Sequence, residues 1–130
     1  MGATIFRAKA AFSGFSVDDL AKAKRFYTGT LGLKISDQKM GLRLRLPGGG
    51  TVFVYPKKNH RPATFTILNL VVGNIDESVD RLKKKGVRFE RYKGIPADRK
   101  GIVRGISRGR GPDIAWFKDP AGNILSVMTA

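Results

Sequence analysis

The chain has 130 residues, a hydrophobic content of 42% and no cysteine, which suits one domain with one core and excludes disulfides and thiolate chemistry. Lysine and arginine number 25 against 10 aspartates and glutamates, and the formal net charge of +15 attracts polyanions such as nucleic acid or an acidic membrane surface. No apolar run is long enough to span a membrane and no signal-peptide pattern opens the chain, so we expect a cytoplasmic protein without membrane insertion.

The first stretch of the chain predicts a strand followed by an amphipathic helix. Residues 4–16 are expected to be extended. Asp18 and Asp19 suit a helix N-terminus, and apolar side chains then recur at helical spacing from Leu20 to Leu31. Lysines and arginines occupy the positions between them, so this helix has an apolar face and a basic face.

Three further strands are expected in the first half. A short strand covers residues 33–38, and leucines then alternate with arginines over 42–46, which places one face on the core and leaves the other charged. The glycines at 48–50 lack the Lys-Ser/Thr pair and the helix of a phosphate loop. They therefore favour a hairpin turn into a strand over 51–55.

A polar linker at residues 57–62 separates this half from the next. It contains His60, the only histidine, which has no partner residues that would suggest a metal or catalytic site. Residues 63–72 predict a nearly continuous apolar strand that is buried on both faces. Asn74 is the expected cap of a second helix, and three lysines followed by Gly86 suit its C-terminus.

The remaining residues predict more strands around one long irregular segment. A strand is expected at about 87–92, and a short one at 102–104 lies inside the Gly- and Arg-rich segment 93–111. Long connections of this kind are often lids or binding loops. Residues 113–118 and 123–128 form a final hairpin around an Asp-Pro-Ala-Gly turn, in which proline presets φ and glycine tolerates positive φ.

The order of elements indicates one β-α-β-β-β unit used twice, over about 1–56 and 63–130. Each unit is too small to bury a core alone. We therefore predict an α+β fold in which the paired units form a curved, mostly antiparallel sheet with helices outside. The concave face of that sheet is the natural ligand cleft.

Short motifs in the two halves occur in a characteristic order. They are Val17-Asp18-Asp19-Leu20, Phe26-Tyr27, Leu31-Gly32-Leu33 and Asp119-Pro120-Ala121-Gly122-Asn123. Together with the repeated unit, they resemble the vicinal oxygen chelate superfamily, which includes glyoxalase I, bleomycin-resistance proteins and extradiol dioxygenases.

The resemblance also implies where metal ligands would stand. The family's metal enzymes place His or Glu on the first and last strands of each unit, and the matching positions here are Phe12, Phe53, Ile67 and Ser126. A divalent cation requires imidazole or carboxylate ligands, and none of these four side chains supplies one. We therefore expect no metal, no cofactor and no catalytic residue of the family type.

The resemblance favours a metal-free protein that binds an aromatic or anionic small molecule and works as a homodimer with clefts between chains. Phe12, Phe53 and Ile67 would form a dry floor, although such residues equally suit a core. Alternation places Ile114 and Trp116 on one face, and we expect Trp116 to join Ser126 at the cleft. The other expected ligand-binding residues are Tyr55 and Asn69, which would line the cleft, and Arg104 and Arg108, which would close over an anionic group.

Three alternatives remain open from the sequence. One is a lyase, isomerase or dioxygenase-like enzyme of unrecognised mechanism, with Asp113, Arg104 and Ser126 as its polar candidates and no nucleophile–base pair in sight. Another is non-specific binding of polyanions through lysine and arginine. The last is a charge-engineered surface, since basic residues occupy so many solvent-facing positions.

Overall fold

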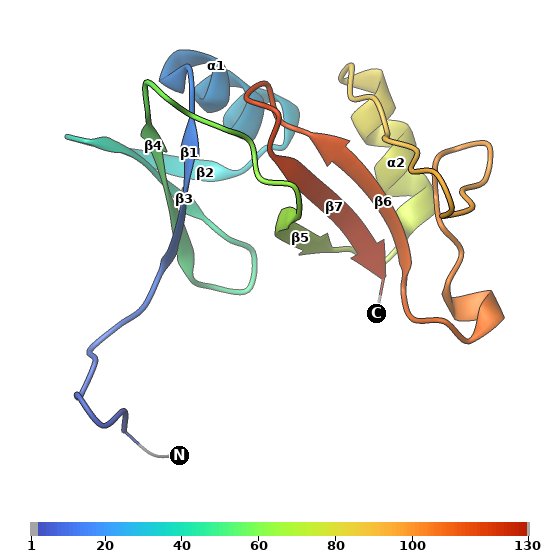
Figure 1. Cartoon of the computed structure of the whole chain (residues 1–130), viewed down its shortest axis with the longest axis horizontal. Helices are drawn as coiled ribbons and strands as arrows, with labels where there is room; N and C mark the ends of the chain where they lie inside the picture. The colour runs from blue at the N-terminus through green and yellow to red at the C-terminus, as the bar shows by residue number, and fades with distance from the viewer. Residues whose placement is uncertain (1–2, 130) are drawn as a thin grey trace.

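The computed structural model describes residues 3–129, which form two β-sheets with helices packed against them (Figure 1). Neither α-helix of this described part is long and apolar enough to cross a membrane. In chain order the elements are β1 (Ser13–Val17), α1 (Leu20–Arg25), the π-helical turn η1 (Phe26–Thr30), β2 (Lys34–Gln38), β3 (Gly41–Arg45), β4 (Thr51–Pro56), β5 (Thr66–Val71), α2 (Ile75–Lys84), the short 3-10 helix η2 (Ile106–Arg108), β6 (Asp113–Lys118) and β7 (Ile124–Thr129).

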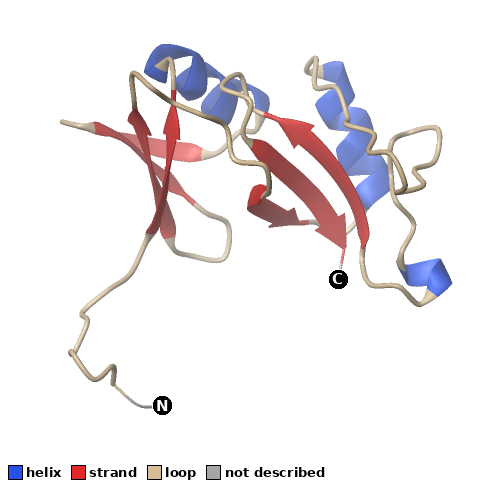
Figure 2. Ribbon diagram, in the orientation of Figure 1, coloured by secondary structure: helices blue, strands red, loops and turns tan. Residues whose placement is uncertain are grey.

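Each half of the chain contributes one mixed sheet. The first sheet has the order β1-β4-β3-β2, with β1 parallel to β4 and the other pairs antiparallel. The second has the order β5-β7-β6, with β5 parallel to β7 and β6 antiparallel to it. Figure 2 shows the two sheets side by side, with the helices outside them. The predicted α+β class and repeated unit are thus confirmed, and the sheet is divided in two.

One face of each sheet is buried. In the first sheet Val17, Leu44 and Val54 pack with Tyr27 from η1, and in the second Phe117 and its neighbours pack under α2. Full burial of such side chains contributes about 1.5–3 kcal/mol each, so these faces hold the fold together. The opposite faces are only partly covered within residues 3–129, because Tyr55 and Val71 are exposed there while Ser126 is buried.

The caps and turns follow the residue types. The Asp19 side chain accepts a hydrogen bond from the backbone N–H of Lys22 at 3.0 Å, and Asn74 accepts one from Glu77 at 3.0 Å. Both satisfy donors that a helix N-terminus leaves free. The glycines at 48–50 have positive φ values, as the predicted hairpin turn requires.

The N-terminal prediction is correct only from Ser13 onward. Residues 3–12 extend away from both sheets (Figure 1), and Ile5 and Phe6 are 101% and 79% exposed. In the sheet, β1 pairs only with β4, and Ser13 is already opposite Val52 near the start of that strand. Earlier residues therefore have no neighbouring backbone with which to form a ladder.

The prediction that residues 63–72 are buried on both faces is wrong. β5 is an edge strand, Leu68 is buried, and Val71 is 68% exposed. An apolar run indicates hydrophobicity but not which element covers the second face, and within residues 3–129 Val71 on that face stays exposed.

Two predicted strands are reduced to single bridges. Phe89 pairs with Phe117, and Val103 pairs with Ile114. Between these bridges, backbone N–H groups bond to a side chain instead of a strand. The Asp98 carboxylate accepts hydrogen bonds from the N–H groups of Lys100 and Ile102, both at 2.9 Å. Such local side-chain bonds compete with strand pairing.

The Asp-Pro-Ala-Gly turn joins the two halves. The Tyr27 hydroxyl donates to Asp119 at 2.7 Å, and the Asn123 amide donates to the carbonyl of Ser16 at 2.9 Å. Burial raises the pKa of the Tyr27 phenol, and the Asp119 carboxylate raises it further. This buried link between η1 and the β6–β7 turn fixes the second sheet beside the first.

Candidate ligand-binding site

Three of the expected site residues lie in a row across the second sheet, and Ser126, the middle one, is fully buried. Ser126 on β7 is opposite Trp116 on β6 and beside Asn69 on β5. The Ser126 hydroxyl donates to the Asn69 side-chain oxygen at 2.6 Å, and the Trp116 indole N–H donates to Thr66 at 3.0 Å. The structure thus places Trp116 on the face of Ser126, as the alternation predicts.

Trp116 forms one wall of a pocket of about 420 Å³, which we call the Trp116 pocket. Tyr92 packs edge-on against the indole, with ring centroids 5.7 Å apart, and holds it in place. The volume lies within the range of about 300–1,000 Å³ usual for small-molecule sites. The other lining residues are Gly94, Ile95, Pro96, Val103, Arg104, Gly105, Arg108, Arg110, Pro112 and Ile114.

The arginines of this pocket have different roles. Arg104 donates to Asp76 at 2.7 Å and to Asp98 at 2.9 Å, and lies 3.7 Å from Asp113. The hydrogen bond from Arg104 lowers the pKa of the Asp76 carboxyl. We therefore assign Arg104 to anchoring the 93–111 segment on α2 rather than to closing over a ligand.

Arg108 and Arg110 are the pocket cations left for a ligand. Both are exposed, and neither takes part in an ion pair within residues 3–129. η2 and the turn after it carry them, and Gly109 between them has a φ of 63° that suits glycine. The pocket thus combines an aromatic wall, apolar walls and two available guanidinium groups.

The other expected residues lie elsewhere. Phe53 and Tyr55 stack on the open face of the first sheet, with centroids 5.9 Å apart. Phe12, just before β1, is 61% exposed, and Arg43 lies 5.7 Å from the centre of its ring. Ile67 lies at an irregularity of β5 and packs against the core. Phe12, Phe53 and Tyr55 thus lie on or beside the first sheet, away from the Trp116 pocket. Ile67 shares the second sheet with Trp116 but does not line that pocket.

The residues at the family's metal positions do not fit a metal. Phe12, Phe53 and Ile67 have no donor atoms, and the Ser126 hydroxyl is bonded to Asn69. Within residues 3–129, no three His, Asp or Glu side chains are grouped to hold an ion. No reaction step through a metal follows from this donor set.

The enzyme candidates of the sequence do not form a reactive group. Asp113 accepts a hydrogen bond from the backbone N–H of Ile106 at 3.0 Å, and Ser126 donates to an amide oxygen rather than to a base.

One Ser–His pair escaped the sequence reasoning. The Ser16 hydroxyl lies 2.6 Å from His60 Nδ1, and His60 Nε2 lies 3.0 Å from the carbonyl of Ala121. A carbonyl only accepts, so Nε2 carries the proton and Nδ1 accepts from Ser16. Since 44 residues separate the pair, no local pattern could reveal it. It ties the linker to both halves, outside the Trp116 pocket.

Comparison with known proteins places the chain in a family. Solved structures similar to it include an integron cassette protein from the mobile metagenome of the Halifax Harbour sewage outfall, with 22% identity, a TM-score of 0.67 and coverage of 95% of this chain and 100% of that one. The antibiotic-binding protein TnmS3 from a Streptomyces species has 24% identity, a TM-score of 0.63 and coverage of 94% and 97%. A fosfomycin resistance protein from Listeria monocytogenes has 15% identity, a TM-score of 0.68 and coverage of 95% and 93%.

These likenesses show the fold. No curated protein matches the sequence significantly. The model of the glyoxalase/bleomycin resistance protein/dioxygenase superfamily matches residues 10–127, which is most of the sequence. The chain therefore belongs to the glyoxalase/bleomycin resistance protein/dioxygenase superfamily.

Proposed function

We propose that the protein binds a flat aromatic molecule carrying an anionic group in the Trp116 pocket and sequesters it without converting it. The observation that carries this proposal is that Trp116, apolar walls and two arginines without an ion pair to any of residues 3–129 meet in one pocket. The Trp116 N–H is already bonded to Thr66, so the indole offers a ligand its ring rather than a donor.

The energetics favour a ligand with both features. Stacking on an aromatic ring contributes about 0.5–1.5 kcal/mol beyond the area buried. A hydrogen bond from a guanidinium to a carboxylate contributes about 1.5–3 kcal/mol, and Arg108 and Arg110 can each supply one. A cationic drug such as bleomycin is a poor match for a chain of net charge +15.

The similarity to TnmS3, which is described as an antibiotic-binding protein, supports a binding role over a catalytic one. A lyase, isomerase or dioxygenase-like activity is the alternative. A catalytic activity predicts that mass spectrometry detects a product after prolonged incubation with the ligand. Our proposal predicts that the ligand is detected with its mass unchanged.

We also propose that two chains form a homodimer in which the open face of the first sheet of one copy covers that of the second sheet of the other. Tyr55 on β4 is 37% exposed and Val71 on β5 is 68% exposed, and Phe12, just before β1, is 61% exposed. Such exposure over two sheet faces is unusual for a monomer. Pairing would add Phe53 and Tyr55 to the surroundings of the Trp116 pocket. Sedimentation equilibrium should show a dimer that tightens as salt screens the charge, and a monomer at every salt concentration would contradict it.

Calorimetry with naphthoic acid and its neutral methyl ester tests the binding proposal. Replacing Arg108 and Arg110 by serine should weaken binding of the acid by about tenfold or more and leave the ester nearly unaffected, since each charged hydrogen bond lost costs about 1.5–3 kcal/mol. The matched control replaces Lys57 and Lys58 in the linker by serine. It also removes two positive charges, but away from the pocket. Equal losses in both double variants would mean that general charge attracts the acid and would refute the site.

A further inference from the structure

A second hollow, of about 520 Å³, lies outside the Trp116 pocket and is lined by cations. It lies beside the end of α2 and along the 86–101 segment. Four of its side chains are basic and none is acidic. The lining residues are Lys83, Gly86, Val87, Arg88, Phe89, Arg91, Lys100 and Gly101.

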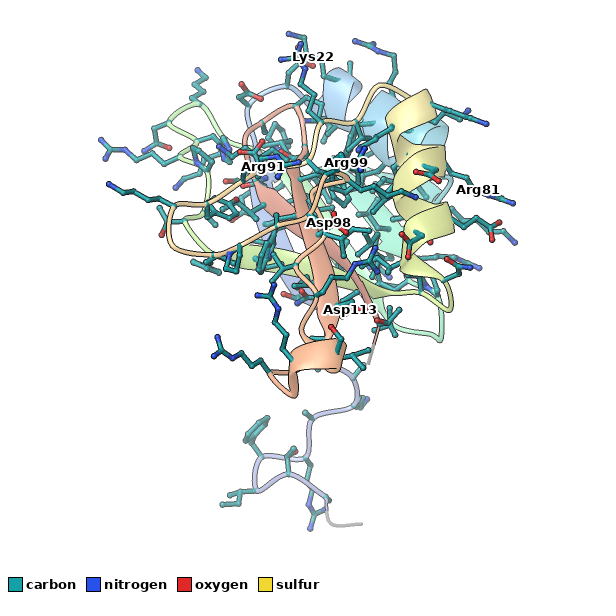
Figure 3. All side chains as sticks on the ribbon, turned by 90° about the vertical axis from the view of Figure 1, so that its right-hand side faces the viewer. Lys22, Arg81, Arg91, Asp98, Arg99 and Asp113 are labelled. Carbon is teal, nitrogen blue, oxygen red and sulfur yellow. The ribbon has the colours of Figure 1, made fainter. Side chains whose placement is uncertain are left out.

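The basic side chains of this hollow differ in their partners. Lys100 is engaged by Asp80 at 3.1 Å and Asp76 at 3.5 Å. Arg91 donates one guanidinium nitrogen to the carbonyl of Arg99 at 2.9 Å, which orients it while leaving its charge uncompensated. In Figure 3, which views the molecule from this side, Arg99 lies between Arg91 and α2. Lys83 and Arg88 are exposed and, within residues 3–129, form no ion pair.

A smaller hollow of about 290 Å³ continues this surface, because Gly86, Val87 and Arg88 line both. It adds Lys85 and Lys118. The two carboxylates that line it already have partners within the protein. Glu90 lies 3.5 Å from Lys118, and Asp119 accepts the internal hydrogen bonds of the β6–β7 turn. We call the combined surface of the two pockets the basic groove. Its basic residues with no carboxylate partner named above are Lys83, Lys85, Arg88 and Arg91.

The backbone fixes the shape of the basic groove. Gly86 ends α2 with a φ of 92°, and a Cβ on Gly101, whose φ is 91°, would lie 2.9 Å from the Cβ of Phe89. Glycine is therefore required at Gly101, where the two segments approach each other. The dipole at the end of α2 explains why lysines are tolerated there. It does not explain the addition of Arg88 and Arg91 from the next segment.

We propose that the basic groove binds the phosphate backbone of a single-stranded nucleic acid. Two adjoining pockets, each lined by cations that form no ion pair within residues 3–129, fit successive phosphates better than one isolated anion. A concave groove suits a flexible strand and cannot lie flat on a bilayer. The aromatic lining residues, Phe89 and Phe26, are half-buried and pack against Phe117, so we assign the contacts to phosphates, which carry no base preference.

The proposal goes beyond attraction by net charge, because it locates the contacts. The test is fluorescence anisotropy of a labelled oligothymidylate, measured from about 50 to 200 mM salt. The variant replaces Lys83, Arg88 and Arg91 by serine. The matched control removes three charges elsewhere by replacing Lys39, Lys57 and Lys58 by serine.

Each phosphate contact on a single strand contributes about 0.7 to the slope of log affinity against log salt, so losing three should reduce the slope by about 2. Affinity of the groove variant should fall about tenfold or more at low salt, while the control variant changes by less than about threefold. Circular dichroism confirms folding, which exposed substitutions should preserve, and naphthoic acid should still bind the variant. Equal losses in both variants would overturn the proposal.

Two further probes decide the class of ligand. Inorganic triphosphate and an oligothymidylate compete for the same groove under this proposal, with the oligonucleotide binding tighter because it reaches both hollows. Triphosphate binding as tightly as the oligonucleotide would overturn the assignment to nucleic acid. Equal or tighter binding of duplex DNA or of phosphatidylserine vesicles, lost in the same groove variant, would overturn it as well.

Discussion

The Tyr27–Asp119 hydrogen bond gives the sharpest prediction about stability. Tyr27 is 0% exposed and Asp119 is 5% exposed, and their 2.7 Å hydrogen bond joins η1 to the turn between β6 and β7. Replacing Tyr27 by phenylalanine keeps the packed ring and removes only the hydroxyl. A hydrogen bond to a charged group contributes about 1.5–3 kcal/mol, so Tyr27→Phe should lower the free energy of unfolding by that amount near neutral pH.

The pH dependence follows from the raised pKa of Tyr27. Its ordinary pKa of about 10 applies to the unfolded chain. Above that pH the unfolded phenol loses its proton and the folded one keeps it, so this contribution to stability is complete below about pH 10 and falls as pH rises. At about pH 11 the wild type has lost about 1.4 kcal/mol of its free energy of unfolding through this phenol. The phenylalanine variant has no phenol at this position and loses nothing there.

The assay is urea unfolding of both proteins at about pH 8 and pH 11. The stability gap between wild type and Tyr27→Phe should narrow by about 1.4 kcal/mol at the higher pH. Effects of lysine and of the other tyrosines are common to both proteins and cancel in the difference. A gap that stays the same at both pH values would show that Tyr27 ionises normally in the folded state, and the account of the buried link would fail.

Three further variants test the structure around the two sites. Asn74→Ala removes the cap of α2 and should cost about 0.5–2 kcal/mol in denaturant unfolding, and an unchanged midpoint would contradict the cap. Gly101→Ala should destabilise by about 1 kcal/mol or more, because its φ is 91° and its new methyl group meets Phe89, whereas Gly29→Ala, with open space around it, should not. Arg104→Met should speed amide hydrogen exchange in the 93–111 segment without altering exchange in the first sheet, and uniform protection would refute its anchoring role.

Much of the fold could be predicted because local chemistry decides it. Alternating leucines and arginines set the faces of β3, and the residue types at Asp19 and Asn74 set the helix starts. The phase of β6 also placed Trp116 beside Ser126. Each of these depends on neighbours a few residues away along the chain.

Other features depend on distant partners and could not be predicted. Arg104 looks like a free loop cation in the sequence, yet it is paired with Asp76 on α2, 28 residues away. The apolar sequence of β5 indicates burial, but only the sheet order shows that it is an edge strand. Likewise, the basic groove arises where the end of α2 meets the following segment, and the charge pattern alone shows only excess cations.

The most direct test of the central claim uses Trp116, which is the only tryptophan. Titration with naphthoic acid should change its fluorescence saturably, with the midpoint that calorimetry gives for the same binding event. Trp116→Phe should weaken the calorimetric affinity by about two- to tenfold, because a stacking contribution of about 0.5–1.5 kcal/mol is reduced. Calorimetric binding that leaves the Trp116 signal flat, together with unchanged affinity in Trp116→Phe, would contradict the placement of the ligand in the Trp116 pocket.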